Sequence, residues 1–509
     1  MTDQASPPLT LDELKRRLWA ACDTFRGVVD ATEYKDFILV ALFLKYVSDV
    51  WEAHAAEARR RYGEDEERVR RRLERERFVL PPGSTFGALY AARDADNLGE
   101  RINVALADIE EANRAKLEGV FRGVDFNSEP KLGATRDRNR RLKTLLEDFR
   151  GLDLSPGRVT EDMLGEAYIY LVERFAADAG KKAGEFYTPA AVSRLLARLV
   201  DPAPGSRIYD PACGSGSMLL RAAEVVEAKG SQDYSLWGQE ANGGTWSLAR
   251  LNMFLHGRDG ARIEWGDTLN DPKLVSSASL LRFDAVLSNP PFSLDKWGAD
   301  AATNDRYGRY ARGVPPKSKA DYAFILHMVE SAQPQTGRVG VVAPHGVLFR
   351  GGAEGRIRRA LVEENLLDAV VGLPAQLFPS TGIPVAMLVF DRARERGGAR
   401  ADAADVVVVD ASREFRDGRR QNALEQAHID RIVTTVQARR PVERYARPVP
   451  ISEIAAHDYN LNIPRYVSSA EAAEAVDIAG VEADIQRLEA ELAEVRGRMK
   501  AYLKELGVA

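Results

Sequence analysis

The residues best suited to chemistry in this chain are Asn289-Pro290-Pro291-Phe292. They follow residues 283–288, an apolar run with the length and β-branched content of a buried parallel strand. Because proline donates no ladder hydrogen bond and fixes φ, the strand must end in a turn, where open α/β folds bind ligands. The Asn289 amide oxygen and the Pro290 carbonyl can accept both hydrogens of an exocyclic amine, while the Phe292 ring stacks on the base that carries it. Without a cofactor site nearby, the alternative is an ordinary turn.

A second segment has the pattern of a nucleotide-binding turn. Residues 206–210 predict a short strand, residues 211–217 a glycine-containing turn, and residues 218–223 the start of a helix. Glycines let the backbone approach a ligand, and a helix N-terminus offers free N–H groups. The turn has neither the dinucleotide spacing Gly-x-Gly-x-x-Gly nor the Gly-Lys-Ser/Thr of a triphosphate site. The acid before it, Asp210, suits a ligand with a cationic amine better than a phosphate.

Two further predicted strands end in an acidic residue. Residues 236–240 end in Glu240, a position from which a carboxylate can hold two ribose hydroxyls. Gly266 and Asp267 follow the predicted strand 262–265, and Asp267 could bind an adenine amine. Acid-tipped strands in series, all upstream of the proline-containing turn, indicate a nucleoside cofactor far more strongly than a glycine turn alone.

Together these segments resemble a known family. Residues 210–216, Asp-Pro-Ala-Cys-Gly-Ser-Gly, followed by Asn-Pro-Pro-Phe at 289–292 resemble the S-adenosylmethionine-dependent amino-group methyltransferases of DNA. Residues 185–189, Glu-Phe-Tyr-Thr-Pro, resemble the N-terminal cofactor motif of that family. The order of the motifs is similar to that of the adenine-N6 enzymes called the gamma group. Residues 18–19, 37–39 and 42–49 are similar to the N-terminal helical domain of the modification (M) subunit of type I restriction-modification systems, and residues 458–466 to the segment that closes its catalytic domain.

This resemblance implies a fold, an activity and a set of site residues. The fold would be an α/β, Rossmann-like S-adenosylmethionine-dependent methyltransferase sheet with an all-helical N-terminal domain and a C-terminal coiled-coil-type helix. The activity would be site-specific methyl transfer from S-adenosyl-L-methionine to N6 of a flipped adenine in double-stranded DNA. The implied catalytic residues are Asn289, Pro290, Pro291 and Phe292, and the implied cofactor-binding residues are Glu185, Phe186, Tyr187, Thr188, Pro189, Ala190, Asp210, Gly214, Ser215, Gly216, Ser217, Glu240 and Asp267.

The resemblance also implies partners. A specificity (S) subunit would read the DNA sequence, and a second M subunit and a motor-nuclease (R) subunit would join the complex. A seam of apolar residues at heptad spacing favours a partner helix at the C-terminus over a helix docked on its own domain. The seam comprises Val481, Ile485, Leu488, Leu492, Val495, Met499, Tyr502 and Leu506.

The predicted organisation has three parts. Residues 9–155 form a helical N-terminal domain, residues 156–466 the methyltransferase domain, and residues 470–509 the C-terminal helix. Arg and acidic residues alternate over 59–77, which favours a solvated helix face over a nucleic-acid patch. The polar stretch 297–320 is expected to be a loop that orders on DNA beside the flipped base.

Two local predictions concern helix starts and strands. Thr188 is expected to be an N-cap with Pro189 at the first helical position. The later strands are predicted at 338–343, 367–372, 385–390 and 406–409, in a sheet that is parallel except for an antiparallel last hairpin implied by the resemblance.

Composition limits the class of protein. The chain has 509 residues, 45% of them hydrophobic and 29% charged, which suits a globular protein with two or three cores. Neither an apolar run of membrane-spanning length nor a secretory signal is present, so a cytoplasmic location in a bacterial or archaeal cell is expected. Two cysteines and six histidines without ligand spacing predict no metal site. The formal net charge of −5 indicates that a partner supplies much of the contact to DNA phosphates.

Other functions stay open from the residues alone. A protein glutamine-amide methyltransferase uses a similar turn, but with Tyr where this chain has Phe292, and without the helical N-terminus. A cytosine-N4 enzyme usually begins the motif with Ser, and a non-catalytic scaffold would need a degraded cofactor turn. A solitary DNA methyltransferase of another phage-defence system is a further alternative. The sequence shows no nuclease motif and no Walker loop, so this chain is not expected to cleave DNA by itself.

Overall fold

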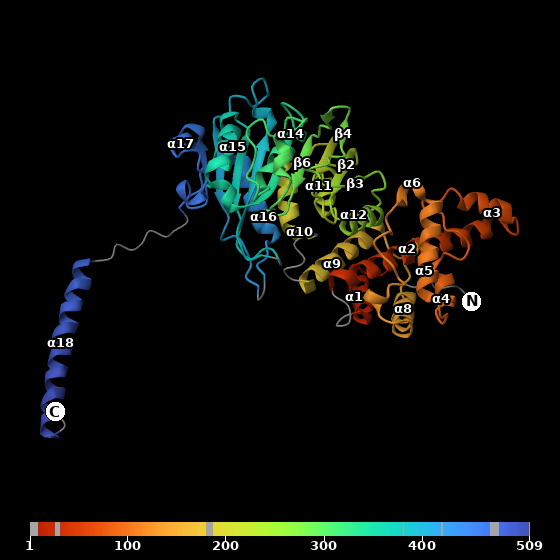
Figure 1. Cartoon of the computed structure of the whole chain (residues 1–509), viewed down its shortest axis with the longest axis horizontal. Helices are drawn as coiled ribbons and strands as arrows, with labels where there is room; N and C mark the ends of the chain where they lie inside the picture. Colours follow the sequence, from red (N-terminus) through yellow and green to blue (C-terminus); the bar gives the residue numbers. More distant parts are fainter. Residues whose placement is uncertain are drawn as a thin grey trace. The chain divides into compact units, whose positions relative to one another are not determined.

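The computed structural model describes residues 9–25, 31–179, 187–379, 381–418, 421–468 and 478–507. The chain divides into two compact units, Met1–Val467 and Ser468–Ala509. Figure 1 shows it coloured from the red N-terminus to the blue C-terminus.

The N-terminal part of the first unit is helical, as predicted. The first helix begins where expected, because the Thr10 hydroxyl accepts a hydrogen bond from the Glu13 N–H at 3.2 Å. The long second helix contains the predicted helical run and ends among exposed arginines, and the third helix carries ion pairs between side chains one turn apart. The region 59–77 is therefore a solvated face. The helices are α1 (Leu11–Ala21), α2 (Ala31–Tyr62), α3 (Glu66–Leu73), α4 (Phe86–Ala91), α5 (Leu98–Ala112), α6 (Arg114–Leu117), α7 (Glu129–Leu132), α8 (Thr135–Arg150) and α9 (Glu161–Ala179), with a short 3-10 turn at η1 (Cys22–Thr24).

These helices share a hydrophobic core with α12 (Gly243–Leu255), which belongs to the sheet-containing part. Phe43 of α2 and Phe254 of α12 both pack against Phe78 at ring-centroid distances of 5.5 Å. The Arg77 guanidinium also donates to both carboxylate oxygens of Asp259, at 3.0 and 3.1 Å. The helical part and the sheet are thus held together by apolar packing and by a bidentate ion pair.

A nine-stranded sheet forms the centre of the first unit, with strand order β11-β10-β8-β9-β7-β6-β1-β2-β3. Neighbouring strands are parallel except where β9 lies between β7 and β8 and where β11 pairs with β10. The predicted strands are confirmed, and β11 is additional. Its two prolines, Pro448 and Pro450, are compatible only with an edge strand, which is the position it takes. The strands are β1 (Ser206–Asp210), β2 (Tyr234–Glu240), β3 (Arg262–Trp265), β6 (Ala285–Ser288), β7 (Arg338–Pro344), β8 (Leu367–Gly372), β9 (Val385–Asp391), β10 (Asp405–Asp410) and β11 (Ala446–Pro450), and a separate small hairpin joins β4 (Val275–Ser276) to β5 (Ser279–Leu280).

Helices cover both faces of this sheet, so its strands are nearly continuous apolar runs. One face packs against α10 (Ala190–Val200), α11 (Ser217–Glu227) and α16 (Gln426–Ala438). The other packs against α14 (Asp321–Ser331) and α15 (Gly352–Glu363). The predicted α/β methyltransferase-type architecture is confirmed. The remaining short elements are α13 (Ala299–Ala302), α17 (Ile451–Ala456), η3 (His345–Leu348), η4 (Arg392–Arg394) and η5 (Ile463–Arg465).

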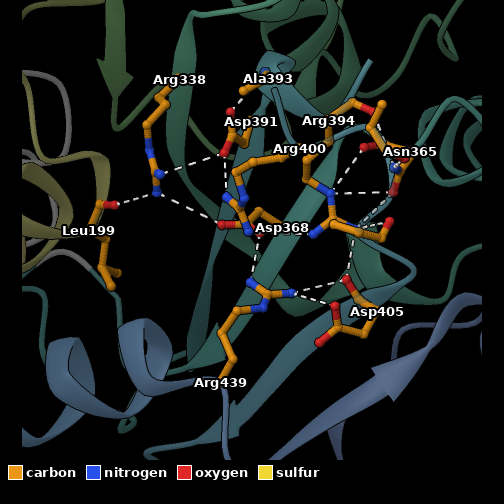
Figure 2. Close-up of polar contacts among 12 residues, drawn as sticks. Leu199, Arg338, Asn365, Asp368, Asp391, Ala393, Arg394, Arg400, Asp405 and Arg439 are labelled. Carbon is orange, nitrogen blue, oxygen red and sulfur yellow. Dashed lines mark hydrogen bonds and ion pairs between the residues drawn. The ribbon is translucent and has the colours of Figure 1, made fainter. Parts of the chain in front are cut away.

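A cluster of buried ion pairs closes the edge of the sheet where β7, β8 and β10 begin (Figure 2). Asp368 of β8 accepts hydrogen bonds from Arg394 and Arg439, both at 2.8 Å, and from Arg400 at 3.0 Å. Burial alone would raise the pKa of Asp368, but Arg439 and Arg400 outweigh it and hold that pKa at about 2. Because Asp368 is buried and Arg394 fully so, each charge depends on its partners in place of water.

The segment 297–320 is a loop, as the sequence predicts, apart from the short helix α13, but several of its residues are buried. Trp297 and Tyr310 are buried and pack against one another at 5.6 Å between ring centroids. Beside them the buried Arg309 guanidinium forms a 2.7 Å ion pair with Asp305. Apolar burial and a paired charge therefore fix part of the segment within the chain itself, and its ordering on DNA stays a prediction.

The second unit contains α18 (Ile478–Glu505). Its eight heptad residues are all exposed, with exposed fractions between 48% and 73%. Over the part of the chain that the structure describes, none of the helices has the length and apolar character needed to cross a membrane.

Candidate active site

The site lies where the chain reverses its direction of travel across the sheet. From β1 the chain adds β2 and β3 on one side, and it then crosses back to add β6 and β7 on the other. Strands β1 and β6 are parallel neighbours, with Ile208 opposite Ala285 and Tyr209 opposite Val286. Asp210 and Asn289, which follow these pairs, therefore emerge at the same carboxyl edge, at the switch point where open α/β sheets bind ligands.

A small cavity joins the two predicted motifs. Asp210 and Asn289, 79 positions apart in the sequence, both contribute to its wall. It is lined by Tyr187, Thr188, Asp210, Ala212, Cys213, Gly214, Ser215, Ser217, Met218 and Asn289.

Asp210 is buried beneath this cavity. Its Oδ1 accepts hydrogen bonds from the Ser288 hydroxyl at 2.7 Å and from the Ala212 N–H at 3.0 Å. Burial raises the pKa of the Asp210 carboxyl to about 7, and the nearby Glu240 charge acts in the same direction. Among the described residues, no cation lies close enough to Asp210 to reverse this rise in its pKa. Asp210 is therefore suited to a cationic ligand group.

The glycine turn after Asp210 has the conformation that the sequence predicts. Gly214 and Gly216 have φ values of 54° and 80°, in the left-handed region that favours glycine. A Cβ on Gly216 would also come within 2.5 Å of the Met253 methyl group. The Ser215 and Ser217 hydroxyls are 2.9 Å apart, and the Asn252 side-chain N–H donates to the Ser215 carbonyl at 2.8 Å. The Asn252 contact thus fixes the turn, and Gly214, Ser215 and Ser217 of the turn line the cavity.

Asn289 is held by one end of its amide and not by the other. Its Nδ2 donates to the Thr188 hydroxyl at 2.9 Å. Its Oδ1 is buried and has no hydrogen-bond partner among the described residues. The prediction that Thr188 is the N-cap of the next helix is wrong: Pro189 is the N-cap residue, and α10 begins at Ala190. The Thr188 hydroxyl instead accepts the hydrogen bond from the Asn289 amide.

The rest of the proline-containing turn is rigidly supported. Pro290 is buried, and Pro291 is exposed. The half-buried Phe292 ring meets the Phe378 ring edge-on at 5.9 Å. Ser293, the next residue, donates its N–H to the buried Asp321 carboxylate at 2.8 Å. Asn289 is the residue of this turn that lines the cavity, and a buried proline and an aromatic ring follow it in the chain.

The predicted N-terminal cofactor motif is partly described. Glu185 and Phe186 lie outside the described residues. Tyr187 lines the cavity, and its hydroxyl donates to Glu173 at 2.9 Å. Burial raises the pKa of Tyr187 well above its usual value, and the Glu173 charge adds to this effect.

Several predicted residues do not line this cavity, namely Pro189, Ala190, Gly216, Glu240, Asp267, Pro290, Pro291 and Phe292. The Glu240 carboxylate accepts the Gly214 N–H at 3.0 Å and the Asn242 N–H at 2.8 Å, so it braces the glycine turn. Asp267 accepts the Leu269 N–H at 2.9 Å and the Asn270 side-chain N–H at 2.7 Å. Asn270 in turn lines a separate cavity of about 220 Å³.

Two contributors were missed from the sequence. Ser288 links the two motifs through Asp210, and Asp321 fixes the backbone after Phe292. A serine at the end of an apolar strand has no sequence pattern that would predict a role in the site. Asp321, the first residue of α14, resembles any acid in a first helical turn. Within the described residues no group of three or more His, Cys, Asp and Glu side chains is arranged to hold a metal ion.

The residues around this cavity fit a cofactor with a cationic amino-acid end. A buried carboxylate with a raised pKa, a glycine turn and adjacent hydroxyls can bind an ammonium and a carboxylate. The unpaired Asn289 oxygen on the same cavity is suited to accept a hydrogen bond from a ligand.

Comparison with known proteins agrees with this geometry. Residues 159–475 match the family described as N-6 DNA Methylase, and residues 14–149 match the HsdM N-terminal domain. The type I restriction enzyme MpnII methylase subunit of Mycoplasma pneumoniae is 30% identical and covers 97% of this chain and 96% of its own length. The MjaVIII methylase subunit of Methanocaldococcus jannaschii is 31% identical over 99% of this chain and 86% of its own length.

A solved structure gives the same result. The type I restriction-modification methyltransferase subunit from Streptococcus thermophilus aligns with a TM-score of 0.80 and 35% identity, over 91% of this chain and all (100%) of that one. The chain therefore belongs to the N-6 DNA methylase family, among relatives of the methylase subunits of type I restriction enzymes, and it is an S-adenosylmethionine-dependent adenine-N6 DNA methyltransferase.

Proposed function

We propose that Asn289 and Pro290 bind the amine of a flipped adenine and direct its nitrogen to the methyl donor. The observation that carries this proposal is the Asn289 oxygen, which is buried, unpaired and on the same cavity as Asp210. A buried acceptor without a partner is costly, and a ligand N–H would relieve that cost. The Thr188 bond fixes which end of the Asn289 amide faces the ligand.

The chemistry required of these residues is polarisation and placement. The adenine amine is a weak nucleophile because its lone pair is delocalised into the ring. Two acceptors, Asn289 Oδ1 and the Pro290 carbonyl, would draw the amine toward tetrahedral geometry and so free the lone pair. When bound, S-adenosylmethionine supplies a methyl group activated by its sulfonium. No strong base is needed first, since the methylated nitrogen is cationic and its proton leaves readily.

Phe292 would hold the extruded base by stacking, a contact worth about 1–3 kcal/mol. Its ring is half-buried against Phe378, so one surface stays available while its orientation is fixed. Pro291 would stiffen the turn between the two groups that bind the base.

The cofactor-binding roles are taken from the family motif, and the cavity lining supports those of Asp210, Gly214, Ser215 and Ser217. Asp210 would bind the ammonium of the methionine end. Gly214, Ser215, Gly216 and Ser217 would approach its carboxylate through backbone and hydroxyl groups. Glu240 would bind the ribose, and Asp267 the adenine. By the family motif, Glu185, Phe186, Tyr187, Thr188, Pro189 and Ala190 would also contribute to cofactor binding, and Tyr187 and Thr188 line the cavity.

Partner binding completes the proposal. The relatives are named methylase subunits of type I restriction enzymes, so this chain would work as one subunit of a complex. We assign the exposed seam of α18 to a specificity subunit that reads the DNA sequence. A second M subunit and a motor-nuclease subunit would join it. Because chromosomal DNA is the substrate, the complex would act in the cytoplasm of a bacterial or archaeal cell.

A labelled-methyl assay tests this function against its alternatives. The chain, alone and with its copurified partner, is offered unmodified genomic DNA and, separately, a release-factor-like protein. The proposal predicts label in adenine N6 of DNA and a strong increase when the partner is present. Label in a protein glutamine would favour the amide-methyltransferase alternative, and full activity without any partner would favour a solitary enzyme.

A further inference from the structure

Large apolar side chains are exposed in three connections at the carboxyl edge that carries the active site. Leu294 lies two residues after Phe292 and is 39% exposed. Phe349, after β7, is 48% exposed, and Ile383, just before the antiparallel β9, is 62% exposed. Since Pro344 pairs with Val385, these last two connections leave the sheet at the same edge. Water-exposed apolar groups beside an active site indicate contact with a substrate or a partner.

The backbone around Leu294 is unusually well fixed for a surface segment. The Leu294 carbonyl accepts the Ala320 N–H at 2.9 Å, and the Lys296 N–H donates to the Lys317 carbonyl at 3.1 Å. Ser293 and Lys296 have φ values of 52° and 51°, a region that non-glycine residues seldom occupy. The segment therefore holds a defined, partly strained shape on both sides of Leu294.

The support for this shape is buried and charged. Asp321, which accepts the Ser293 N–H at 2.8 Å, is 3% exposed. The Arg350 guanidinium donates to the other Asp321 oxygen at 2.9 Å and also contacts Glu354 at 3.2 Å. A buried ion network thus fixes the backbone next to an aliphatic side chain that remains in water. That arrangement gains little for folding, which suggests a role in binding.

Three lysines lie on the backbone segments beside the same position. Lys296 and Lys317 are exposed and lie on the two backbone segments that are hydrogen-bonded beside Leu294. Lys319, half-buried, precedes Ala320, whose N–H binds the Leu294 carbonyl. Two exposed acids share the segment: Asp295 follows Leu294 directly, and Asp300 pairs with Lys317. An apolar tip flanked by lysines is complementary to bases flanked by phosphates.

We propose that Leu294 is a positioning residue that enters the base stack of duplex DNA where the target adenine leaves it. This inference rests on the proposed function, because the adenine must reach Asn289, five residues before Leu294. Extruding a base leaves an unstacked gap, and an apolar wedge on a rigid backbone fills that gap and lowers the cost of the flipped state. Lys296 and Lys319 would bind the phosphates on either side, and Phe349 and Ile383 would extend the apolar contact.

The test separates base extrusion from the chemistry that follows it. The native complex is given two duplexes that carry its modification site, one with the target adenine paired to thymine and one with it opposite an abasic position. In the second duplex the adenine is already easily extruded. Leu294→Ala should lower the methylation rate on the paired duplex by about ten-fold or more, since unstacking costs a few kcal/mol. On the abasic duplex its rate should stay within about two-fold of the wild-type rate.

Two further variants control for folding and for mere exposure. Leu294→Met, which keeps an apolar side chain of similar size, should retain most of the rate on both duplexes. Val104→Ala, at an exposed aliphatic residue of α5, should change neither rate.

A second readout uses 2-aminopurine at the target position, whose fluorescence rises on extrusion. With Leu294→Ala that rise should be lost on the paired duplex and kept on the abasic one.

Each outcome has a separate meaning. Equal rates for Leu294→Ala and wild type on the paired duplex would overturn the wedge. Equal losses on both duplexes would also overturn it and indicate a general contact, and loss of the copurifying partner would show that the occupant is a protein. A wild-type complex that methylates neither duplex would overturn the proposed function and the wedge with it.

Discussion

The Ser288 hydroxyl donates a hydrogen bond of 2.7 Å to the Asp210 carboxylate, two side chains 78 positions apart in the sequence. It connects the end of β6, which carries Asn289, to the end of β1, which carries the glycine turn. The two halves of the proposed site are therefore joined directly by one buried bond. A ligand that changes the charge of Asp210 would therefore affect the hydrogen bond to Ser288, the residue before Asn289.

Ionisation of Asp210 should couple cofactor binding to pH. Its folded pKa of about 7 lies above the usual 3.8, so the proton is bound more tightly in the folded state. The stability from this group is fully present below about pH 3.8 and is lost as pH rises through 7. Without cofactor, Asp210→Asn should therefore raise the free energy of unfolding at pH 8, by about 4 kcal/mol at most.

The same substitution should weaken cofactor binding, because the ammonium of the cofactor loses its counter-charge. Wild-type affinity measured by titration calorimetry should rise several-fold between pH 6 and pH 7.5, as Asp210 ionises. The affinity of Asp210→Asn should be low and nearly constant over that range. A variant with the wild-type pH dependence would show that Asp210 does not face the cofactor amine.

The ion cluster around Asp368 should be a stability element separate from the site. Asp368→Asn leaves Arg394, Arg400 and Arg439 without their shared carboxylate, which should cost about 3–5 kcal/mol in the free energy of unfolding. Because the Asp368 pKa is lowered to about 2, its contribution is present above about pH 3.8 and is lost as pH falls through 2. Urea unfolding at pH 7 measures the difference.

The matched control is Asp402→Asn, at an exposed acid of the same region, which should change the free energy of unfolding by less than about 0.5 kcal/mol. Equal stabilities for the two variants would contradict the role given to the cluster.

The seam of α18 should be needed for partner binding and not for the catalytic unit. Ending the chain before residue 480 should release the specificity subunit, while the first compact unit keeps its folded signal and its cofactor affinity. Leu488→Asp with Leu492→Asp should have the same effect, because charge on a heptad seam opposes helix pairing. Copurification measures release. Ala490→Asp, on the opposite face, should leave the complex intact, and loss of cofactor binding on truncation would favour a helix docked on its own domain.

The strands and the glycine turn could be predicted from the sequence because strong local residue patterns specify them. The β-branched runs that end at Asp210 and Ser288, and the positive φ values at Gly214 and Gly216, each follow from local residue types. Thr188 shows the limit: as a residue before proline it reads as a helix cap, but its hydroxyl is used by Asn289, 101 positions away. Such a tertiary contact leaves no local signal.

Other differences have the same origin. Glu240 lies at a strand end, as predicted. Its carboxylate also accepts hydrogen bonds from the Gly214 and Asn242 N–H groups, which the spacing of residues in the sequence does not predict. The stretch 297–320 is polar in composition, but Trp297 and Tyr310 find buried partners within it. The edge strand β11 was hidden by its prolines, which are tolerated only because no strand pairs on its outer side.

The most direct measurement is methyl transfer and cofactor affinity for Asn289→Ala in the native complex. The substitution removes a buried, unpaired acceptor on the shared cavity, so the transfer rate should fall by at least about 100-fold. Cofactor affinity should stay near the wild-type value, and Asn127→Ala, at an exposed residue of the N-terminal part, should change neither quantity. A variant Asn289→Ala that methylates DNA at the wild-type rate would contradict the account.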